Sequence, residues 1–267
     1  LLLCFLERCE ASAAGLSTEI PKSELLERSG CSSAVLDGLL KRGILEGSEK
    51  EIGRLPFSAA AEPEALLPLT PAQQKAYDEI GERFAQKEIC LLHGVTSSGK
   101  TEVYVHLIAE ELAAGRQVLY LLPEIAITTQ IMERLSKRFG DKLLVYHSKF
   151  SDNERVEIWN RLLQTDGPLL IVGVRSSLFL PFHRLGLIIV DEEHDPSYKQ
   201  QDPAPRYQAR NAAMVLASMH GAKTLLGSAT PSLETYYNAR TGKYGWVELT
   251  TRYGEGLMPE ILPVDIK

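Results

Sequence analysis

The chain has 267 residues, of which 44% are hydrophobic and 24% are charged. This length and composition are typical of one large globular domain, or of a large and a small one, and argue against disordered, collagen-like and membrane-spanning chains. Lysine and arginine total 29 against 35 for aspartate and glutamate, which gives a net charge of −6. Bulk positive charge therefore cannot hold nucleic acid, although a local basic groove on an acidic body still can.

The chain opens on an apolar run, LLLCFLERCE, which is too short for the roughly 20 apolar residues of a spanning helix. It lacks the basic start and cleavage site of a signal peptide, and no membrane partner is expected. Because residue 1 is leucine, we expect the run to be an interior helix of an excised segment. The cysteines form no CxxC pair and no zinc site, and they favour a reducing cytoplasm over a disulfide scaffold. They are Cys4, Cys9, Cys31 and Cys90.

Residues 1–55 predict a small winged-helix domain. Apolar residues at helical spacing indicate two short helices joined around Gly30, which is typical of a helix-turn-helix, and residues 44–55 are the candidate for a two-stranded wing. Basic residues occur only at Lys41 and Arg42, at the far end of the would-be reading helix. Packing or protein docking is therefore favoured over base reading, which stays open as the alternative.

Prolines among alanine and glutamate predict a linker over residues 56–69. From residue 70 to residue 267, short apolar runs alternate with amphipathic helical stretches. The runs are ICLLH, QVLYLL, KLLVY, LLIVGV, LGLIIV and AKTLLG. Because they are continuous rather than alternating, they predict strands buried on both faces, and hence an α/β fold with a mostly parallel sheet flanked by helices.

The segment GVTSSGKT follows the first of these runs and precedes a helical stretch, as the P-loop pattern GxxxxGK[ST] requires. It predicts a P-loop NTPase (RecA-like) fold that binds ATP. The candidate ATP-binding residues are Gly94, Val95, Thr96, Ser97, Ser98, Gly99, Lys100 and Thr101. The glycines permit a tight turn whose N–H groups face phosphate oxygens, Lys100 reaches the β and γ phosphates, and the Thr101 hydroxyl binds Mg²⁺. A vestigial loop without nucleotide is the alternative.

Hydrolysis also needs a carboxylate that holds the metal and one that orients the attacking water. The run LGLIIVDEEH delivers Asp191 and Glu192 to the carboxyl end of a predicted strand, where open α/β sheets bind ligands. We therefore predict Asp191, with Thr101, as a metal ligand, and Lys100, Asp191 and Glu192 as catalytic residues. His194 lies two residues beyond Glu192, where it can sense the state of that carboxylate. An acid-rich surface turn is the alternative.

These motifs resemble those of superfamily-two helicases. DEEH is similar to their second motif, GSATPS to the SAT motif between nucleotide and DNA, LLPEIAITTQ to a segment that contacts the DNA backbone, and LTPAQQKAY to the adenine-recognition segment. The resemblance implies that Gln73 contacts the adenine. It also implies that Ser228 and Thr230 of the SAT motif couple ATP to DNA.

Six blocks in one order over residues 69–235 more narrowly resemble the primosomal helicases that restart stalled bacterial replication forks. The blocks are GVTSSGKTEVY, LLPEIAITTQ, HSKFSDNERVEIW, VGVRSSLFLPF, DEEHDPSYKQ and RYQARNAA. The resemblance implies unwinding of forked and single-stranded DNA, with replication-restart proteins, primosome proteins and single-stranded DNA-binding protein as partners. It also implies that this chain is the middle of a longer protein whose second helicase lobe and zinc-binding cysteines lie elsewhere. Zinc is expected only there.

Ser97 stands where that family usually has glycine, and Asn211 where it usually has aspartate. The segment QQDPAPRY lacks an aromatic residue that is common there. We expect the first departure to leave the fold intact and to bear on turnover. The others bear on coupling to DNA.

The stretch after the acid motif interleaves Tyr198, Lys199, Arg206, Tyr207 and Arg210 with prolines and resembles the family's aromatic-rich loop. Aromatic faces stack on unpaired bases at about 1–3 kcal/mol each, and cations offset phosphate charge. The loop is therefore predicted to bind single strands, with a floppy insertion or a lobe-packing loop as alternatives. The complete set of predicted DNA-coupling residues is Arg175, His194, Tyr198, Lys199, Tyr207, Arg210, Ser228 and Thr230.

The function predicted from these patterns is the ATP-binding part of a DNA helicase that starts primosome assembly at stalled or repaired forks. Taken alone, the 267 residues are expected to bind Mg-ATP weakly and to hydrolyse it negligibly, because an arginine from a second lobe completes such sites. A double-strand translocase, an RNA helicase lobe and a non-hydrolysing scaffold for replication proteins remain alternatives. The P-loop and the acid pair argue against the scaffold.

Overall fold

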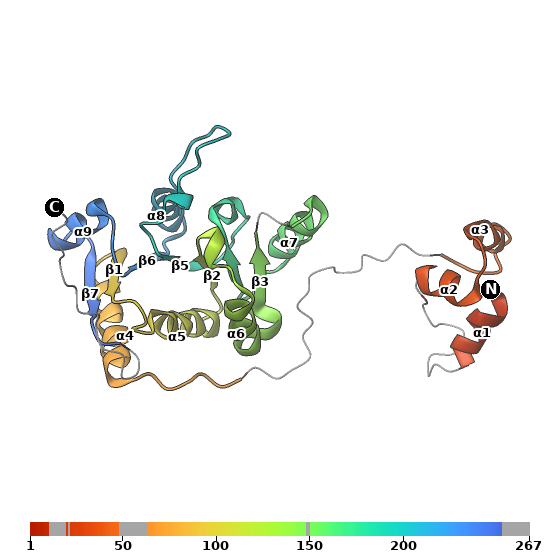
Figure 1. Cartoon of the computed structure of the whole chain (residues 1–267), viewed down its shortest axis with the longest axis horizontal. Helices are drawn as coiled ribbons and strands as arrows, with labels where there is room; N and C mark the ends of the chain where they lie inside the picture. The colour runs from red at the N-terminus through yellow and green to blue at the C-terminus, as the bar shows by residue number, and fades with distance from the viewer. Residues whose placement is uncertain (11–19, 21, 48–63, 148–149, 253–267) are drawn as a thin grey trace, which may run out of the picture. The chain divides into compact units, whose positions relative to one another are not determined.

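The computed structural model describes residues 1–10, 20, 22–47, 64–147 and 150–252. The chain divides into two compact units, Leu1–Gly53 and Arg54–Lys267 (Figure 1). The predicted linker lies partly outside the described residues. Its described end, residues 64–69, contains no helix or strand and is held to the second unit, where the Glu64 amide donates to the carbonyl of Lys137 at 2.8 Å.

The first unit contains three described helices: α1 (Leu2–Glu10), α2 (Lys22–Ser29) and α3 (Ser33–Lys41). Gly30 ends α2 with a φ of +61°, a left-handed backbone that glycine adopts without strain. Leu25 and Leu36 are buried, one on each helix flanking this turn. The helix-turn-helix arrangement is thus present. Of the predicted wing, residues 44–47 form no strand, and residues 48–55 lie outside the described part of the chain.

A seven-stranded sheet forms the centre of the second unit, with strand order β3-β4-β2-β5-β6-β1-β7. The strands are β1 (Ile89–Gly94), β2 (Gln117–Leu121), β3 (Leu143–Tyr146), β4 (Leu170–Gly173), β5 (Leu185–Asp191), β6 (Lys223–Ser228) and β7 (Gly245–Leu249). Each neighbouring pair is parallel. The predicted α/β class is confirmed, and β1 to β6 correspond to the six apolar runs.

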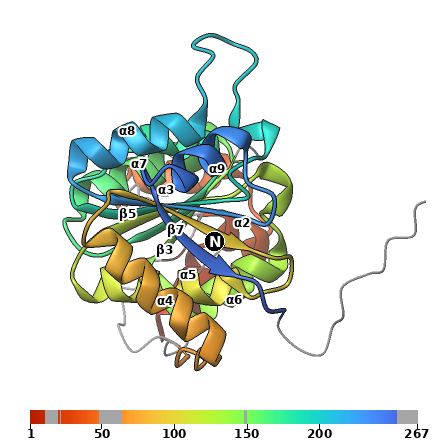
Figure 2. The same ribbon diagram turned by 90° about the vertical axis from the view of Figure 1, so that its left-hand side faces the viewer.

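Helices cover both faces of the sheet (Figures 1 and 2). One face carries α4 (Pro71–Phe84), α5 (Lys100–Ala113) and α6 (Thr129–Phe139), and the other carries α7 (Asp152–Gln164), α8 (Ala209–His220) and α9 (Leu233–Arg240). Side chains along β5 alternate between the two layers: Leu187 and Ile189 pack toward the first, Ile188 and Val190 toward the second. This two-sided burial explains why the strands read as continuous apolar runs.

The seventh strand was not predicted from the sequence. Along β7, Gly245, Val247 and Leu249 are buried, whereas Trp246 is half-buried and Glu248 is exposed. The strand lies at the edge of the sheet and pairs with β1. Its apolar residues therefore alternate, which is the pattern of a half-buried strand rather than of a central one.

The parallel register brings the carboxyl ends of β1, β5 and β6 together. Asp191 of β5 lies opposite Gly227 of β6, and Ser228 of β6 lies opposite His93 of β1. Short 3₁₀ helices η2 (Glu124–Ala126), η4 (Arg175–Phe179) and η5 (Pro196–Tyr198) follow β2, β4 and β5, and η3 (Gly140–Lys142) joins α6 to β3. Among the described helices, none is long and apolar enough to cross a membrane.

Candidate functional site

The P-loop connects β1 to α5 at the carboxyl edge of the sheet. Gly99 caps α5 with a φ of +81°, and a Cβ at this position would collide with Nε2 of Gln73, so that only glycine fits. The first N–H groups of an α-helix lack the usual acceptor four residues before them and can face an anion, although the Glu102 amide here donates to the carbonyl of Gly99 at 2.9 Å. The Lys100 ammonium is buried and donates to the carbonyl of Gly94 at 2.9 Å. Backbone donors and a cation therefore meet in one cradle.

Gln73 is buried beneath this loop with an exposed fraction of 3%. Its Oε1 accepts from the Thr70 amide at 2.9 Å and closes the capping box of α4, while Nε2 donates to the carbonyls of Ser98 and Gly99 at 3.4 Å. The side chain thus ties α4 to the phosphate loop. Its contact with adenine stays a prediction.

Two serines of the loop differ in environment. Ser97 is exposed and has a φ of +62°, a left-handed backbone that a non-glycine residue adopts with strain. Ser98 is buried, and its Oγ has no hydrogen-bond partner within the described structure. The Val95 amide donates to the carbonyl of Leu249, which ends β7, while Thr96 is exposed and Thr101 half-buried. The unpartnered Ser98 hydroxyl suits a polar ligand in the loop.

Asp191 ends β5 with its carboxylate held from several sides. Its Oδ1 accepts from the Tyr104 hydroxyl and the Glu192 amide, both at 3.1 Å, and its Oδ2 accepts from the Tyr120 hydroxyl at 3.2 Å. Loss of solvation and the charge of Glu192 raise the pKa of Asp191 to about 6, partly opposed by Lys100. Because the negative charge of Asp191 is unfavourable here, a bound cation would stabilise the ionised carboxylate.

Glu192 and His194 face the SAT motif on β6. Glu192 has a φ of +46° and an exposed side chain, and its Oε2 lies 3.7 Å from His194 Nδ1. That same nitrogen lies 2.8 Å from the Ser228 hydroxyl, and His194 Nε2 lies 3.4 Å from the Thr230 hydroxyl. The structure therefore brings together Glu192 and His194 of DEEH with Ser228 and Thr230 of the SAT motif.

Glu193 was overlooked in the sequence, where it reads as one more acid of DEEH. It is fully buried and accepts from Arg210 Nη1 at 2.8 Å, from the amide and hydroxyl of Ser232, and from the Thr235 hydroxyl. The prediction that Arg210 faces DNA is wrong in this structure, because the buried carboxylate needs a cationic partner. The available signal in the sequence was the run of three consecutive acids directly after a buried strand.

Tyr198 also departs from its prediction as a stacking platform. Only 1% of it is exposed, and its hydroxyl lies 3.1 Å from the carbonyl of Leu121 and 2.7 Å from that of Asp191. The turn η5 directs the ring under the sheet edge, where these two carbonyls satisfy its polar end. The residue therefore packs the ends of β2 and β5 and cannot stack on a base.

The remainder of the loop, residues 199–208, projects as a hairpin from the α8 side of the sheet (Figure 2). Lys199 pairs with Gln208, the Gln200 amide donates to the carbonyl of Tyr207, and residues 201–206 are exposed. These hydrogen bonds within the hairpin argue against the alternative of a floppy insertion. The Lys199 ammonium is used within it, on the carbonyl of Arg206.

Tyr207 lies at the base of the hairpin. Its half-buried ring contacts Phe179 edge to face at a centroid distance of 5.1 Å. Arg175 Nη1 donates to the carbonyl of Ser197 at 2.9 Å. Burial raises the pKa of Tyr207, partly opposed by Arg175. Arg175 and Tyr207 therefore gather beside the loop rather than at the P-loop.

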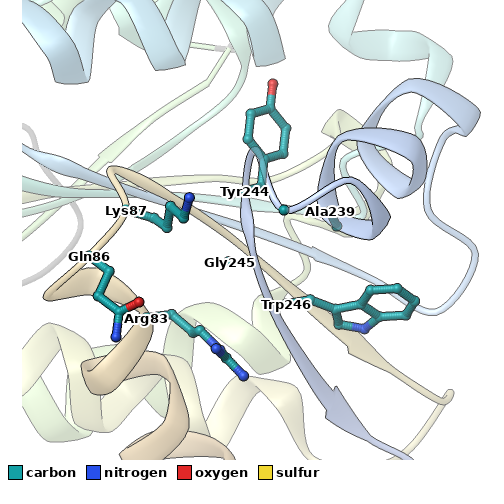
Figure 3. Close-up of a pocket in the computed structure, with 8 residues that line it drawn as sticks. Arg83, Gln86, Lys87, Ala239, Tyr244, Gly245 and Trp246 are labelled. Atoms are coloured by element: carbon teal, nitrogen blue, oxygen red, sulfur yellow. The ribbon is translucent and has the colours of Figure 1, made fainter.

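A shallow pocket lies between the turn that precedes β1 and the start of β7 (Figure 3). Arg83, Lys87, Tyr244 and Trp246 line it. Because these residues flank the amino ends of β1 and β7, the pocket is at the opposite edge of the sheet from the P-loop. It is not part of the nucleotide site.

The donors at the carboxyl edge fit ATP and Mg²⁺. Among the described residues, no cluster of three or more histidine, cysteine, aspartate or glutamate side chains could hold a metal ion by itself. Mg²⁺ is commonly held by one or two protein oxygens together with substrate phosphates. Thr101 and Asp191 offer such oxygens beside the P-loop.

Comparison with known proteins agrees with this geometry. The family model "DEAD/DEAH box helicase" matches residues 70–239, and "Winged helix domain, PriA helicase, Bacteroidota" matches residues 1–52. "Replication restart protein PriA" of Bacillus subtilis (strain 168) is 40% identical over 255 residues, which cover 93% of this chain and 31% of that protein. The protein of the same name from Rickettsia typhi (strain ATCC VR-144 / Wilmington) is 48% identical over 176 residues, which cover 66% of this chain and 27% of that protein.

These similarities confirm the resemblance to the primosomal restart helicases. The chain spans about a third of the length of the curated relatives it matches. The helicase family model covers well over half of the chain. The chain therefore belongs to the DEAD/DEAH box helicase family.

Proposed function

We propose that the second unit binds Mg-ATP at the carboxyl edge of its sheet and hydrolyses it as the first motor lobe of a replication-restart DNA helicase. One observation carries the proposal. The register of β1, β5 and β6 brings the P-loop, the Asp191–Glu192 pair and the SAT motif to one place. Three motifs that are far apart in the sequence thereby form one candidate catalytic edge.

In this mechanism, the first turn of α5 and Lys100 bind the phosphates, for which Lys100 exchanges its contact with Gly94. Thr101 and Asp191 hold Mg²⁺, which when bound neutralises charge on the phosphate oxygens. Glu192 orients the attacking water and accepts its proton. Gln73 holds the phosphate loop in place through its contacts with the carbonyls of Ser98 and Gly99.

Coupling to DNA runs through the SAT motif. His194 lies between the Glu192 carboxylate and the hydroxyls of Ser228 and Thr230. A strand bound near the SAT motif can therefore bias the position of the water-orienting carboxylate. Lys199 and Tyr207 of the hairpin and Arg175 beside it are the remaining candidates for strand contact.

The partners proposed are forked and single-stranded DNA, replication-restart and primosome proteins, and single-stranded DNA-binding protein, in the cytoplasm. The names of the relatives, which are replication restart proteins, support this choice. For the first unit we propose protein docking rather than base reading. Its third helix has Lys41 near its end, with Arg42 just beyond, and Asp37 in its middle.

The test uses a full-length protein of this family in which this chain provides the matched region. Hydrolysis of ATP is measured without nucleic acid, with forked DNA and with RNA, and unwinding of the fork is followed in parallel. We expect forked DNA to stimulate hydrolysis and Glu192→Gln to abolish it while a fluorescent ATP analogue still binds. Stimulation by RNA alone, or hydrolysis unaffected by Glu192→Gln, contradicts the proposal.

A further inference from the structure

Two buried tyrosines converge on the candidate metal ligand. Tyr104 comes from α5 and Tyr120 from β2, and both are 0% exposed. Their hydroxyls reach different oxygens of Asp191, at 3.1 Å for Oδ1 and 3.2 Å for Oδ2. Their rings contact edge to face with centroids 5.7 Å apart. Both carboxylate oxygens are therefore fixed by side chains from separate elements.

The neighbouring strand leaves room for this contact. A Cβ at Gly227, the glycine that opens GSATPS, would collide with the Tyr104 hydroxyl and lie 3.4 Å from Asp191 Oδ1. The backbone of Gly227 is not left-handed, so a turn does not require glycine here. Space for the Tyr104–Asp191 hydrogen bond is the requirement that the structure shows.

The hydrogen bond also connects the two candidate metal ligands. Thr101 is one helical turn before Tyr104 on α5, and Asp191 ends β5. The Tyr104 hydroxyl therefore links the helix that carries one ligand to the strand that carries the other. Burying two hydroxyls has a desolvation cost, and phenylalanine would fill the same space without it. Packing alone does not explain tyrosine at both positions.

We propose that Tyr104 and Tyr120 are positioning residues that orient the Asp191 carboxylate for Mg²⁺, and that Gly227 makes room for the Tyr104 hydroxyl. This inference rests on the proposed nucleotide site. Partners that orient a metal ligand typically contribute about 10–100-fold to metal affinity. Neither tyrosine touches the nucleotide in the proposed mechanism, so their effect is specific to the metal.

The experiment titrates Mg²⁺ into the 267-residue chain at a fixed concentration of a fluorescent ATP analogue and repeats the binding in EDTA. For Tyr104→Phe with Tyr120→Phe, we expect the Mg²⁺ concentration at half-saturation to rise about 10-fold or more. Binding in EDTA stays unchanged. Tyr244→Phe is the matched control, because it removes the hydroxyl of a buried tyrosine, which donates to Met214 Sδ at 3.5 Å, at the opposite edge of the sheet, and it should match the wild type.

Gly227→Ala gives an independent variant that removes no hydroxyl. It should weaken Mg²⁺ affinity in the wild-type background. It should add little to Tyr104→Phe, because both variants break the same hydrogen bond between Tyr104 and Asp191. Where the double tyrosine variant melts below the assay temperature, each single variant should still raise the half-saturating Mg²⁺ concentration. Unchanged Mg²⁺ affinity in the folded variants overturns the inference. A wild-type chain that binds no nucleotide under either condition overturns the proposed function instead.

Discussion

Ser97 shows how the phosphate loop constrains a single residue. Its φ of +62° lies in the region where a side chain is strained by about 1–3 kcal/mol and glycine is not. The related helicases usually have glycine at this position, and the left-handed backbone explains that preference. The Ser97 side chain is exposed, so the cost of serine here lies in the backbone rather than in side-chain packing.

Ser97→Gly is therefore expected to stabilise the chain. Relief of strain, reduced by the greater freedom of glycine in the unfolded chain, should leave a gain of roughly 1 kcal/mol. The corresponding rise in Tm is about 2–4 °C and is measurable by thermal melting. Gly99→Ala is the matched opposite, because its φ of +81° and the contact with Gln73 should make alanine destabilising. A lower Tm for Ser97→Gly contradicts this account.

Asp191 should reduce stability at neutral pH in the metal-free chain. Its pKa is raised from 3.8 to about 6, so the folded state holds a proton that the unfolded state releases between these values. Stability relative to Asp191→Asn is therefore lost as the pH rises from about 4 to 6. We expect Asp191→Asn to have the higher Tm at pH 7.5 and the difference to vanish near pH 4. A constant difference across this range would show that ionisation of Asp191 is not its origin.

At the scale of elements, the segment between β5 and α8 has two parts with different roles. Tyr198 and Arg210 are buried in packing and ion-pair contacts, whereas residues 201–206 form the exposed hairpin. The segment is thus fixed at its base and open to solvent at its tip. Contact of this segment with a nucleic acid strand is therefore proposed for the hairpin, including Lys199 and Tyr207 at its ends, and not for the two buried residues.

Tyr198→Ala should consequently act on folding. Loss of a fully buried aromatic side chain with a satisfied hydroxyl typically lowers the free energy of unfolding by about 3–5 kcal/mol. Tyr207→Ala, which removes a half-buried ring, should lower it by less. Urea unfolding of both variants gives the comparison. Equal stability of Tyr198→Ala and wild type would restore Tyr198 as a candidate for stacking.

The sequence predicted β1 to β6 and the P-loop because each has a local signature, either a continuous apolar run or a fixed spacing of glycine and lysine. It missed β7 because an edge strand alternates. It also predicted that Tyr198 and Arg210 face a DNA strand, whereas both side chains point into the protein. Side-chain direction there depends on a buried carboxylate, Glu193, and on carbonyls at the ends of other strands, and none of these is adjacent in sequence.

At the scale of the whole molecule, the net charge is −6, yet the proposed ligand is itself strongly negative. Binding must therefore depend on the local donors of the P-loop, since the overall field repels the nucleotide. Lys100 is the cation within that loop, and the first turn of α5 supplies the N–H groups. Removal of Lys100 should have a far larger effect than removal of another lysine.

The most direct test of the account is the affinity of the 267-residue chain for a fluorescent ATP analogue in Mg²⁺. We expect Lys100→Ala to weaken binding by about 10-fold or more, because a hydrogen bond to a charged group contributes roughly 1.5–3 kcal/mol. Lys142→Ala, which removes an exposed lysine just before β3, should bind like the wild type. Thermal melting confirms that both variants are folded. Equal affinity of folded Lys100→Ala and wild type would contradict a nucleotide site at the carboxyl edge of this sheet.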